Sequence, residues 1–261
     1  AGGIAAGCVA VGVGVAVLDV ESNSRAFIAD RADGDYLGDY NLLTAANADI
    51  SARKVYLDAY AKNDLSAKAY NGAASYAGGL TVSVASVNVD NNTQAYLGEM
   101  SEVYATNGVS VKASSDTTAE SDVANVGLSY SGVSIGVAVA NSDVTGATTA
   151  KIGDYALIKS PNSTSHVEID ADSRSVADAD AVAGSGGLVG AGVGAGARAQ
   201  VSDTTESSIG EFVEIGANKV SVTADALPAA RSLAAGGAAG FGLAAGAAVA
   251  ISKTSANVGA F

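Results

Sequence analysis

The chain has 261 residues, of which 48% are hydrophobic, and a formal net charge of −13. This apolar content is sufficient for a folded core and excludes a disordered chain. The acidic balance excludes nucleic acid as a partner, because phosphates are bound by clustered Lys and Arg, and it disfavours an anionic membrane surface. With no Trp, four Phe and 32 Gly, the core must be built from small side chains, which suit thin, closely stacked sheets.

Strands are the elements predicted along the whole chain. In residues 9–18, Val alternates with Gly, Ala and Leu, and residues 133–140 repeat this pattern. A period of two with β-branched residues is typical of a strand. In residues 82–89 the Val positions shift phase near Ala85–Ser86, which predicts a bulge or a corner. Residues 233–251 are the weakest predicted strand, because their Ala and Gly also allow a helix.

Two short signals recur at intervals of roughly 50 to 70 residues, which indicates an array whose units bury their apolar faces against their neighbours. The first signal, A-x-I/L-G-D/E with variants, is found at 26–30, 95–99, 150–154 and 207–211. The second, V-x-V-x-A with variants, is found at 55–59, 109–113, 167–171 and 220–224. We therefore predict one repeat domain over residues 1–261, with approximate units 1–69, 70–124, 125–181, 182–232 and an incomplete 233–261. The missing initiator Met and the break inside a unit indicate a fragment of a longer chain.

The predicted fold is all-β, a parallel β-helix of about four and a half repeats, with another fibrous β-sheet assembly as the alternative. The strand face opposite the Val row carries Gly and Ala. Since an exposed face is normally polar, we expect this face to be covered as well, either by another wall of the same molecule or by another chain. The predicted assembly faces comprise Val11, Val13, Val15, Val133, Ile135, Val137, Gly132, Gly136, Gly192 and Gly194.

No pattern of catalytic residues is recognisable, so the chain is predicted not to be an enzyme. The segment Gly132-Val-Ser-Ile-Gly136 matches G-x-S-x-G, but a nucleophile elbow requires a strand-to-helix turn and Ser134 lies within an alternating run. The single Cys8 and the single His166 cannot form a Cys/His metal cluster. We expect no cofactor other than, at most, calcium.

Acidic side chains at alternate positions are weak calcium candidates. Asp170 and Asp172, and Asp178 and Asp180, each place two carboxylates on one face of a strand. Calcium needs six or more converging oxygens, and neither an EF-hand loop nor a calcium-binding nonapeptide repeat is present. The alternative is an acidic ladder in contact with solvent. Tyr residues such as Tyr56 and Tyr60 also allow two interpretations, an exposed contact strip or packing at a rim.

The repeat resembles that of leukotoxin-type filamentous adhesins, very large exoproteins of Gram-negative bacteria. The residues that carry the resemblance are G-x-G-V-A-V at the first strand, A-x-I-G-D at Ala150–Asp154 and V-x-V-x-A at Val220–Ala224. The resemblance covers essentially the whole chain. It implies a parallel β-helix stalk or fibre that is exported to the cell surface, and it implies no catalytic residues.

The expected function is therefore structural. The chain is predicted to be a segment of a bacterial cell-surface or secreted adhesin that forms a stiff stalk or a self-associating extracellular filament. Expected partners are like chains or neighbouring repeats and a surface glycan or protein of a host or bacterium, without membrane insertion. The alternative is a β-helix module that binds a glycan or calcium.

Overall fold

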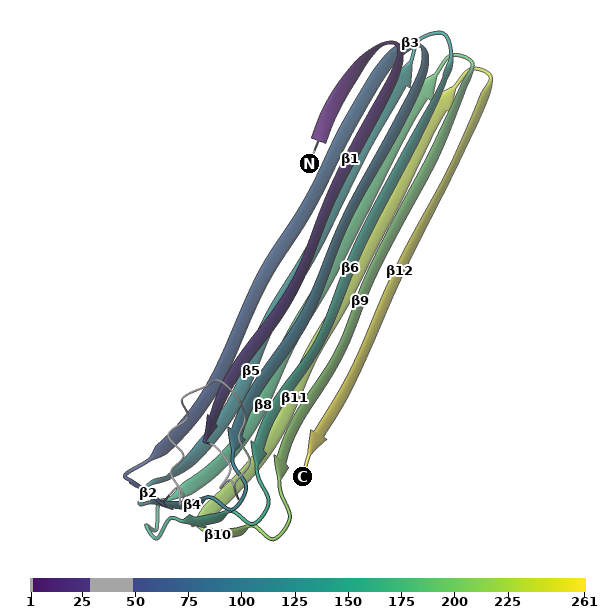
Figure 1. Ribbon diagram of the computed structural model, residues 1–261. Coiled ribbons are helices and arrows are strands. Elements are labelled where there is room, and N and C mark those ends of the chain that lie inside the picture. Colours follow the sequence, from purple (N-terminus) through teal and green to yellow (C-terminus); the bar gives the residue numbers. More distant parts are fainter. Residues whose placement is uncertain (1, 29–48) are drawn as a thin grey trace.

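The computed structural model describes residues 2–28 and 49–261, and these form parallel β-structure without a helix (Figure 1). The long strands are β1 (Gly2–Ile28), β3 (Val55–Leu97), β5 (Gly108–Ser129), β6 (Val133–Ile152), β8 (His166–Gly187), β9 (Gly190–Ile209), β11 (Lys219–Gly240) and β12 (Leu243–Ala260). The short strands are β2 (Asp49–Ala52), β4 (Glu102–Ala105), β7 (Leu157–Lys159) and β10 (Glu214–Gly216). The predicted all-β class is confirmed, and the parallel stacking is consistent with a β-helix.

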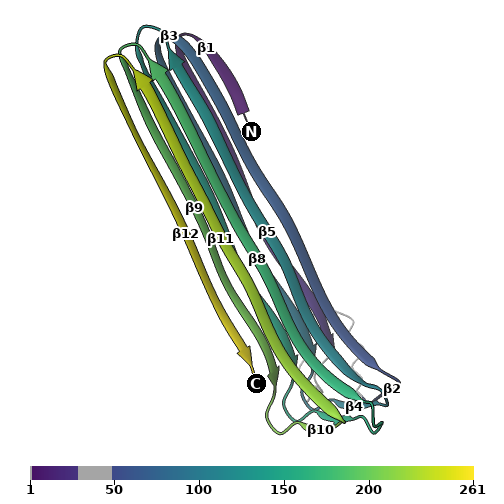
Figure 2. The ribbon, with the colours of Figure 1, turned by 180° about the vertical axis from the view of Figure 1, so that it is seen from behind.

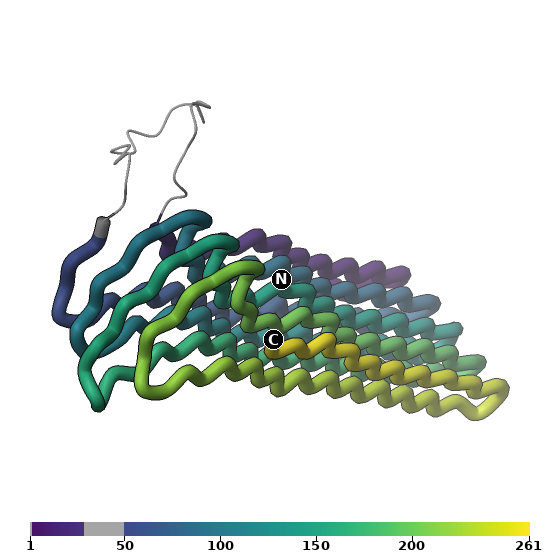
Figure 3. The backbone as a smooth tube through the Cα atoms, turned by 90° about the horizontal axis from the view of Figure 1, so that it is seen from below, coloured from purple at the N-terminus to yellow at the C-terminus, as the bar shows by residue number. Residues whose placement is uncertain are grey.

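The long strands form two walls that meet along a common edge, called here the tip. Wall 1 contains β3 up to Ser75, β5, β8 and β11, and the first six residues of β1 pair with it. Wall 2 contains β1 from Val9, β3 from Gly78, β6, β9 and β12. β3 therefore crosses the tip and belongs to both walls. Figure 2 shows the molecule from behind, and Figure 3 shows the flattened coils from below.

Both repeat signals occupy equivalent places in successive coils. The V-x-V-x-A signal opens the wall 1 strands, where Val55 pairs with Val109, Val109 with Val167 and Val167 with Val220. The other signal ends the wall 2 strands, where Ile28 pairs with Leu97 and Leu97 with Ile152. The longer first interval arises between Ile28 and Asp49, where residues 29–48 lie outside the described residues.

The four short strands form a second parallel sheet, called here the base, at the end opposite the tip. The G-D/E pair of the repeat signal makes the turn into this sheet. A Cβ on Gly153 would lie 2.7 Å from the Glu99 nitrogen, so a larger residue cannot fit there. The Asp154 carboxylate accepts a hydrogen bond from the Glu211 N–H at 2.9 Å. The signal therefore joins one coil to the next.

The backbone ladder continues around the tip. The Tyr130 N–H donates to the Ser75 carbonyl at 3.0 Å, and the Ser131 N–H donates to the Tyr76 carbonyl at 2.7 Å. Gly132 lies in this turn, where a Cβ would lie 1.5 Å from the Ala77 carbonyl oxygen. Successive coils are therefore held together by main-chain hydrogen bonds even where the chain reverses direction.

The large apolar side chains that are fully buried all lie away from the tip, in the base or in the parts of the walls next to it. They are Leu97, Ile152, Ile158, Ile169, Val87, Val103, Val109, Val111, Val144, Val167 and Val201. They belong to two clusters, one between the two walls and one between the base and the wall residues next to it. Both clusters also contain many Ala residues. Near the tip, the space between the walls is filled mainly by Gly, Ala, Ser, Thr and Asn.

The Gly/Ala face is covered by the opposite wall of the same molecule, which was one of the two alternatives. The Val row does not face the interior of the molecule, because Val9 to Val17 point outward and Val13 is 64% exposed. The predicted bulge at Ala85–Ser86 was wrong, since β3 pairs with β6 there without interruption. The phase shift marks the point where apolar residues move from the outer face to the inner face. Residues 233–251 are strands and not a helix.

Candidate interaction surface

The outer surface divides into two regions of opposite character. We define the distal half as residues 2–16, 70–85, 124–140, 182–197 and 235–250, which adjoin the tip. The proximal half contains the remaining wall residues. In the proximal half most outward positions carry charged and polar side chains, whereas in the distal half most carry Val, Ile, Leu, Ala and Gly. An exposed apolar region of this size is typical of a surface that meets a partner.

On wall 2 the distal outer face is a grid of small and branched apolar residues. One row across the strands reads Val11, Leu80, Ile135, Gly192 and Ala245, and the next reads Val13, Val82, Val137, Gly194 and Ala247. Ile135 is 45% exposed and Val11 is 56% exposed. The strands β1, β3 and β6 form a raised surface of branched side chains, and β9 forms a glycine groove beside it.

Seven of the ten predicted assembly residues lie on this outer grid, and Val133 lies in the next row toward the tip. The other two glycines lie elsewhere. Gly132 is in the tip turn, and Gly136 points inward, where a Cβ would lie 3.0 Å from Asn125 Oδ1 and 3.1 Å from the Gly184 carbonyl oxygen.

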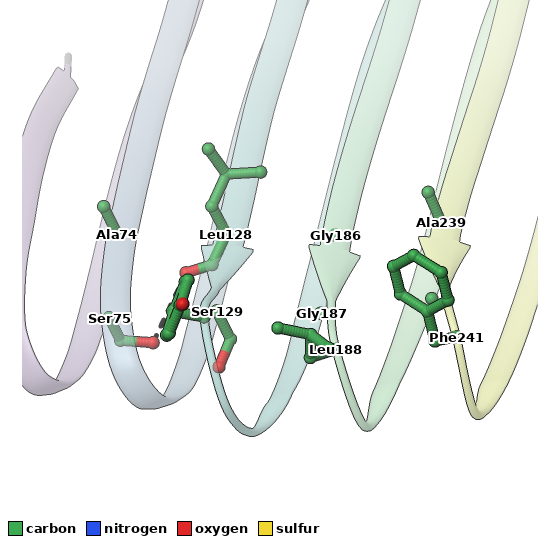
Figure 4. Close-up of a pocket in the computed structure, with 11 residues that line it drawn as sticks. Ala74, Ser75, Leu128, Ser129, Gly186, Gly187, Leu188, Ala239 and Phe241 are labelled. Atoms are coloured by element: carbon green, nitrogen blue, oxygen red, sulfur yellow. Dashed lines mark hydrogen bonds between the residues drawn. The ribbon is translucent and has the colours of Figure 1, made fainter.

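On wall 1 the distal outer face contains a shallow apolar groove of about 680 Å³ (Figure 4). Its floor is the register row Ala74, Leu128, Gly186 and Ala239, and its rim at the tip contains Tyr130, Leu188 and Phe241. Tyr130 stacks on Tyr76 with ring centroids 5.7 Å apart. The groove contains no charged side chain, so it offers contact area and no catalytic group.

Inside the distal half, the walls are joined by hydrogen bonds. The Asn71 amide of wall 1 donates to the Val82 carbonyl of wall 2 at 3.0 Å, and Asn125 donates in the same way to the Val137 carbonyl. Ser185 donates to the Gly192 carbonyl at 2.9 Å. Ser134 is fully buried within β6, which confirms its interpretation as a small residue in a strand.

On wall 1 the proximal outer face carries ion pairs. Lys68 contacts Asp122 at 2.8 Å and Glu120 at 3.6 Å, and Lys112 contacts Glu168 at 3.0 Å. These pairs are partly exposed, so each contributes little to stability. Such a surface is well solvated.

All four calcium candidates lie on this same outer face of β8. Asp170 is already engaged, since Lys112 lies 3.6 Å away and the Thr223 hydroxyl donates to it at 2.6 Å. Burial, followed by the charge of Asp180, raises the pKa of Asp178, and burial, followed by the charge of Asp170, raises the pKa of Asp172. In residues 2–28 and 49–261, no three His, Cys, Asp or Glu side chains are grouped so that they could hold a metal ion.

One acidic residue that the sequence did not single out lies between the walls. Asp203 is 4% exposed and accepts a hydrogen bond from Ser173 at 3.2 Å, while its Oδ1 atom has no hydrogen-bond partner. Burial raises its pKa, and hydrogen bonds from Ser175 and Ser173 act in the opposite direction. It belongs to a buried polar band in which Ser115 lies 2.9 Å from the Thr148 hydroxyl and Asn91 donates to Thr117 at 3.1 Å.

Tyr56 and Tyr60 both point outward from wall 1 and are 65% and 57% exposed, so they are not packed at a rim. None of the described residues forms a helix long and apolar enough to cross a membrane.

No protein-family model, curated protein or solved structure matches the chain.

Proposed function

We propose that the chain is a structural segment of a bacterial cell-surface or secreted adhesin, in which stacked coils of a parallel β-helix form a stiff stalk or a self-associating extracellular filament. The observation that supports this function most directly is the ladder that runs along both walls and around the tip. In a solenoid each coil contacts mainly its neighbours, so the length in the stacking direction follows the number of coils. In this segment the longer dimension runs along the strands (Figure 1), and further coils would extend the molecule in the stacking direction.

The resemblance of the repeat to filamentous adhesins supports the exported, extracellular location. The pattern of charge is compatible with it, because an acidic outer surface keeps a long molecule in solution. The groove on wall 1 and the grid on wall 2 are apolar contact surfaces, and neither brings together a nucleophile, a base and an oxyanion-binding group.

Small-angle X-ray scattering with negative-stain electron microscopy tests this proposal. We expect rods of constant width, and the same rods when calcium is removed with a chelator. A compact particle, or a chain that folds only with calcium, would contradict the stalk function.

The exposed tyrosines favour a second candidate function, a glycan-binding module. Tyr56, Asp58 and Tyr60 occupy alternate positions of β3, so all three side chains lie on one outer face. Aromatic rings beside a carboxylate provide both stacking and hydrogen-bonding groups for a glycan. Binding to a glycan array that is lost in Tyr56→Ala and retained in Tyr130→Ala would support this function. An array without any bound glycan would exclude it for the glycans tested.

A further inference from the structure

The outer face of wall 2 has features that select a particular partner. The distal grid spans five strand segments, which at about 4.8 Å per strand and about 3.3 Å per residue over roughly eight residues gives an area of roughly 630 Å². Two such faces in contact would bury about 1,300 Å², which is within the range of specific protein interfaces. The area is therefore sufficient for a stable pair.

We propose that the partner of this face is a second copy of the chain, packed wall 2 against wall 2 around a twofold axis parallel to the strands. This proposal rests on the self-association in the proposed function and specifies which face associates. A twofold axis in this direction reverses the order of the strands. β3 then faces β9 of the second copy, β1 faces β12, and β6 faces itself.

The side chains are complementary in this arrangement. Leu80, Val82 and Val84 of β3 lie opposite Gly192, Gly194 and Gly196 of the second copy, at matching positions in the register. Val11 and Val13 of β1 lie opposite Ala245 and Ala247. At these positions large residues face small ones, which allows the two sheets to interdigitate there. Val15 faces Val249, and β6 packs Ile135 and Val137 against the same residues of the second copy, so these contacts are between branched side chains.

The charges below the apolar grid agree with the same arrangement. Asp19, Asn88, Asp143, Gln200 and Lys253 form one register row on the outer face of wall 2. The twofold axis places Asp19 of one copy opposite Lys253 of the other. This pair attracts, and it favours the register that aligns the two apolar grids. Asp143 lies on the axis and faces Asp143 of the second copy, but in each copy its charge is balanced by Arg198, which lies 3.1 Å away.

Wall 1 does not offer the same complementarity. The equivalent twofold axis would place Glu120 opposite Asp178 and Asp122 opposite Asp180 of the second copy, because these residues share register rows on β5 and β8. Like charges in contact oppose association. Wall 2 is therefore the face that pairs.

The matched variants Gly194→Trp and Gly237→Trp test the proposal. A Cβ at either glycine meets no atom within 4 Å, so both variants are expected to fold. Gly194 lies in the groove on wall 2, whereas Gly237 lies on the outer face of wall 1. In sedimentation equilibrium we expect a wild-type dimer, an unchanged dimer for Gly237→Trp, and an association constant roughly tenfold or more lower for Gly194→Trp.

A cross-linking experiment locates the axis. Both variants are made in a Cys8→Ser background. Position 137 lies on β6, so in the proposed pair Val137→Cys faces the same cysteine of the second copy. Position 126 lies on the outer face of wall 1, so Val126→Cys lies outside the proposed interface. A bis-maleimide of roughly 8 Å suits sheets that pack about 10 Å apart. We expect a linked dimer for Val137→Cys and none for Val126→Cys.

Three results would overturn the pairing: a wild-type chain that stays monomeric, equal effects of the two Trp variants, or a monomer that floats with phosphatidylcholine vesicles through its distal half. The last result would assign the surface to lipid. Circular dichroism verifies the fold of each variant. Monomeric rods in X-ray scattering would leave the stalk function intact and remove only the pairing, whereas a compact particle would contradict the stalk function itself.

Discussion

In both halves inward and outward side chains alternate along the strands, but the large apolar side chains face inward in the proximal half and outward in the distal half. In β5, Val109 and Val111 point inward and Lys112 points outward, whereas nearer the tip Asn125 points inward and Val126 points outward. The proximal half is stabilised by buried apolar side chains, which is the usual arrangement in water. The distal half is stabilised by coil-to-coil ladders and by side-chain hydrogen bonds between the walls. The reversal leaves branched apolar side chains exposed in the distal half, and the proposed pairing of wall 2 rests on this exposure.

The largest predicted effect comes from placing a charge on each half. Ile169→Asp introduces a carboxylate into a site that is fully buried, so we expect loss of the folded state, since an unpaired buried charge costs several kcal/mol. Ile135→Asp lies on the exposed distal face and is expected to fold. Urea unfolding followed by circular dichroism measures both. If Ile135→Asp unfolds the chain and Ile169→Asp does not, the distal outer face is buried and the comparison of the two halves is contradicted.

A matched pair on one strand gives the next effect. Leu97 is 0% exposed and Leu80 is 39% exposed, and both belong to β3. Leu97→Ala is expected to lower the free energy of unfolding by about 2–5 kcal/mol, because it leaves a cavity. Leu80→Ala is expected to lower it by less than about 1 kcal/mol in the monomer. Equal losses would show that the two leucines are buried alike.

The buried carboxylate predicts a dependence of stability on pH. Since the pKa of Asp203 is raised above its usual value of 3.8, the folded state binds this proton more tightly than the unfolded state does. Its contribution favours folding at low pH and is lost as the pH rises through the folded-state pKa. Asp203→Asn should therefore raise the melting temperature at pH 7, with a difference that shrinks as the pH falls toward 4. A pH-independent difference would show that the charge is not the cause.

The smallest effects concern hydroxyl groups between the walls. Ser134 Oγ is buried without a hydrogen-bond partner, so Ser134→Ala is expected to leave the free energy of unfolding unchanged or to raise it slightly. Ser115 lies within hydrogen-bonding distance of Thr148 and Ser173, so Ser115→Ala is expected to lower it by about 1 kcal/mol. Thermal melts of the two variants side by side measure this difference.

Much of the fold could be predicted from local patterns. The alternation in residues 9–17 and 133–140 predicted strands, and the two repeat signals lie in register in the structure. Alternation shows that two sets of residues face opposite ways, but it does not show which set faces inward. That choice depends on the opposite wall, where Asn71 and Asn125 donate hydrogen bonds across the interior. The outward Val row was therefore not predictable from β1 alone.

The candidate surface was predicted in part. Val11 and Ile135 were selected for their alternation, and both lie on the outer grid. Gly136 has the same small side chain as Gly194, but it lies on the inner face because it is one position out of phase with the outer row. Asp203 could not be singled out, because in the sequence it lies in a stretch of Ser, Thr and Asp. Its burial results from packing of β9 against the opposite wall.

The reversal of polarity between the halves is tested most directly by cysteine labelling at low protein concentration in the Cys8→Ser background. Two neighbouring pairs on β5 are compared, Val111→Cys with Lys112→Cys and Asn125→Cys with Val126→Cys. We predict fast maleimide labelling at positions 112 and 126, and slow labelling at positions 111 and 125, where the native side chains are 0% and 1% exposed. Faster labelling at position 125 than at position 126 would show that Val126 faces inward and would contradict the reversal.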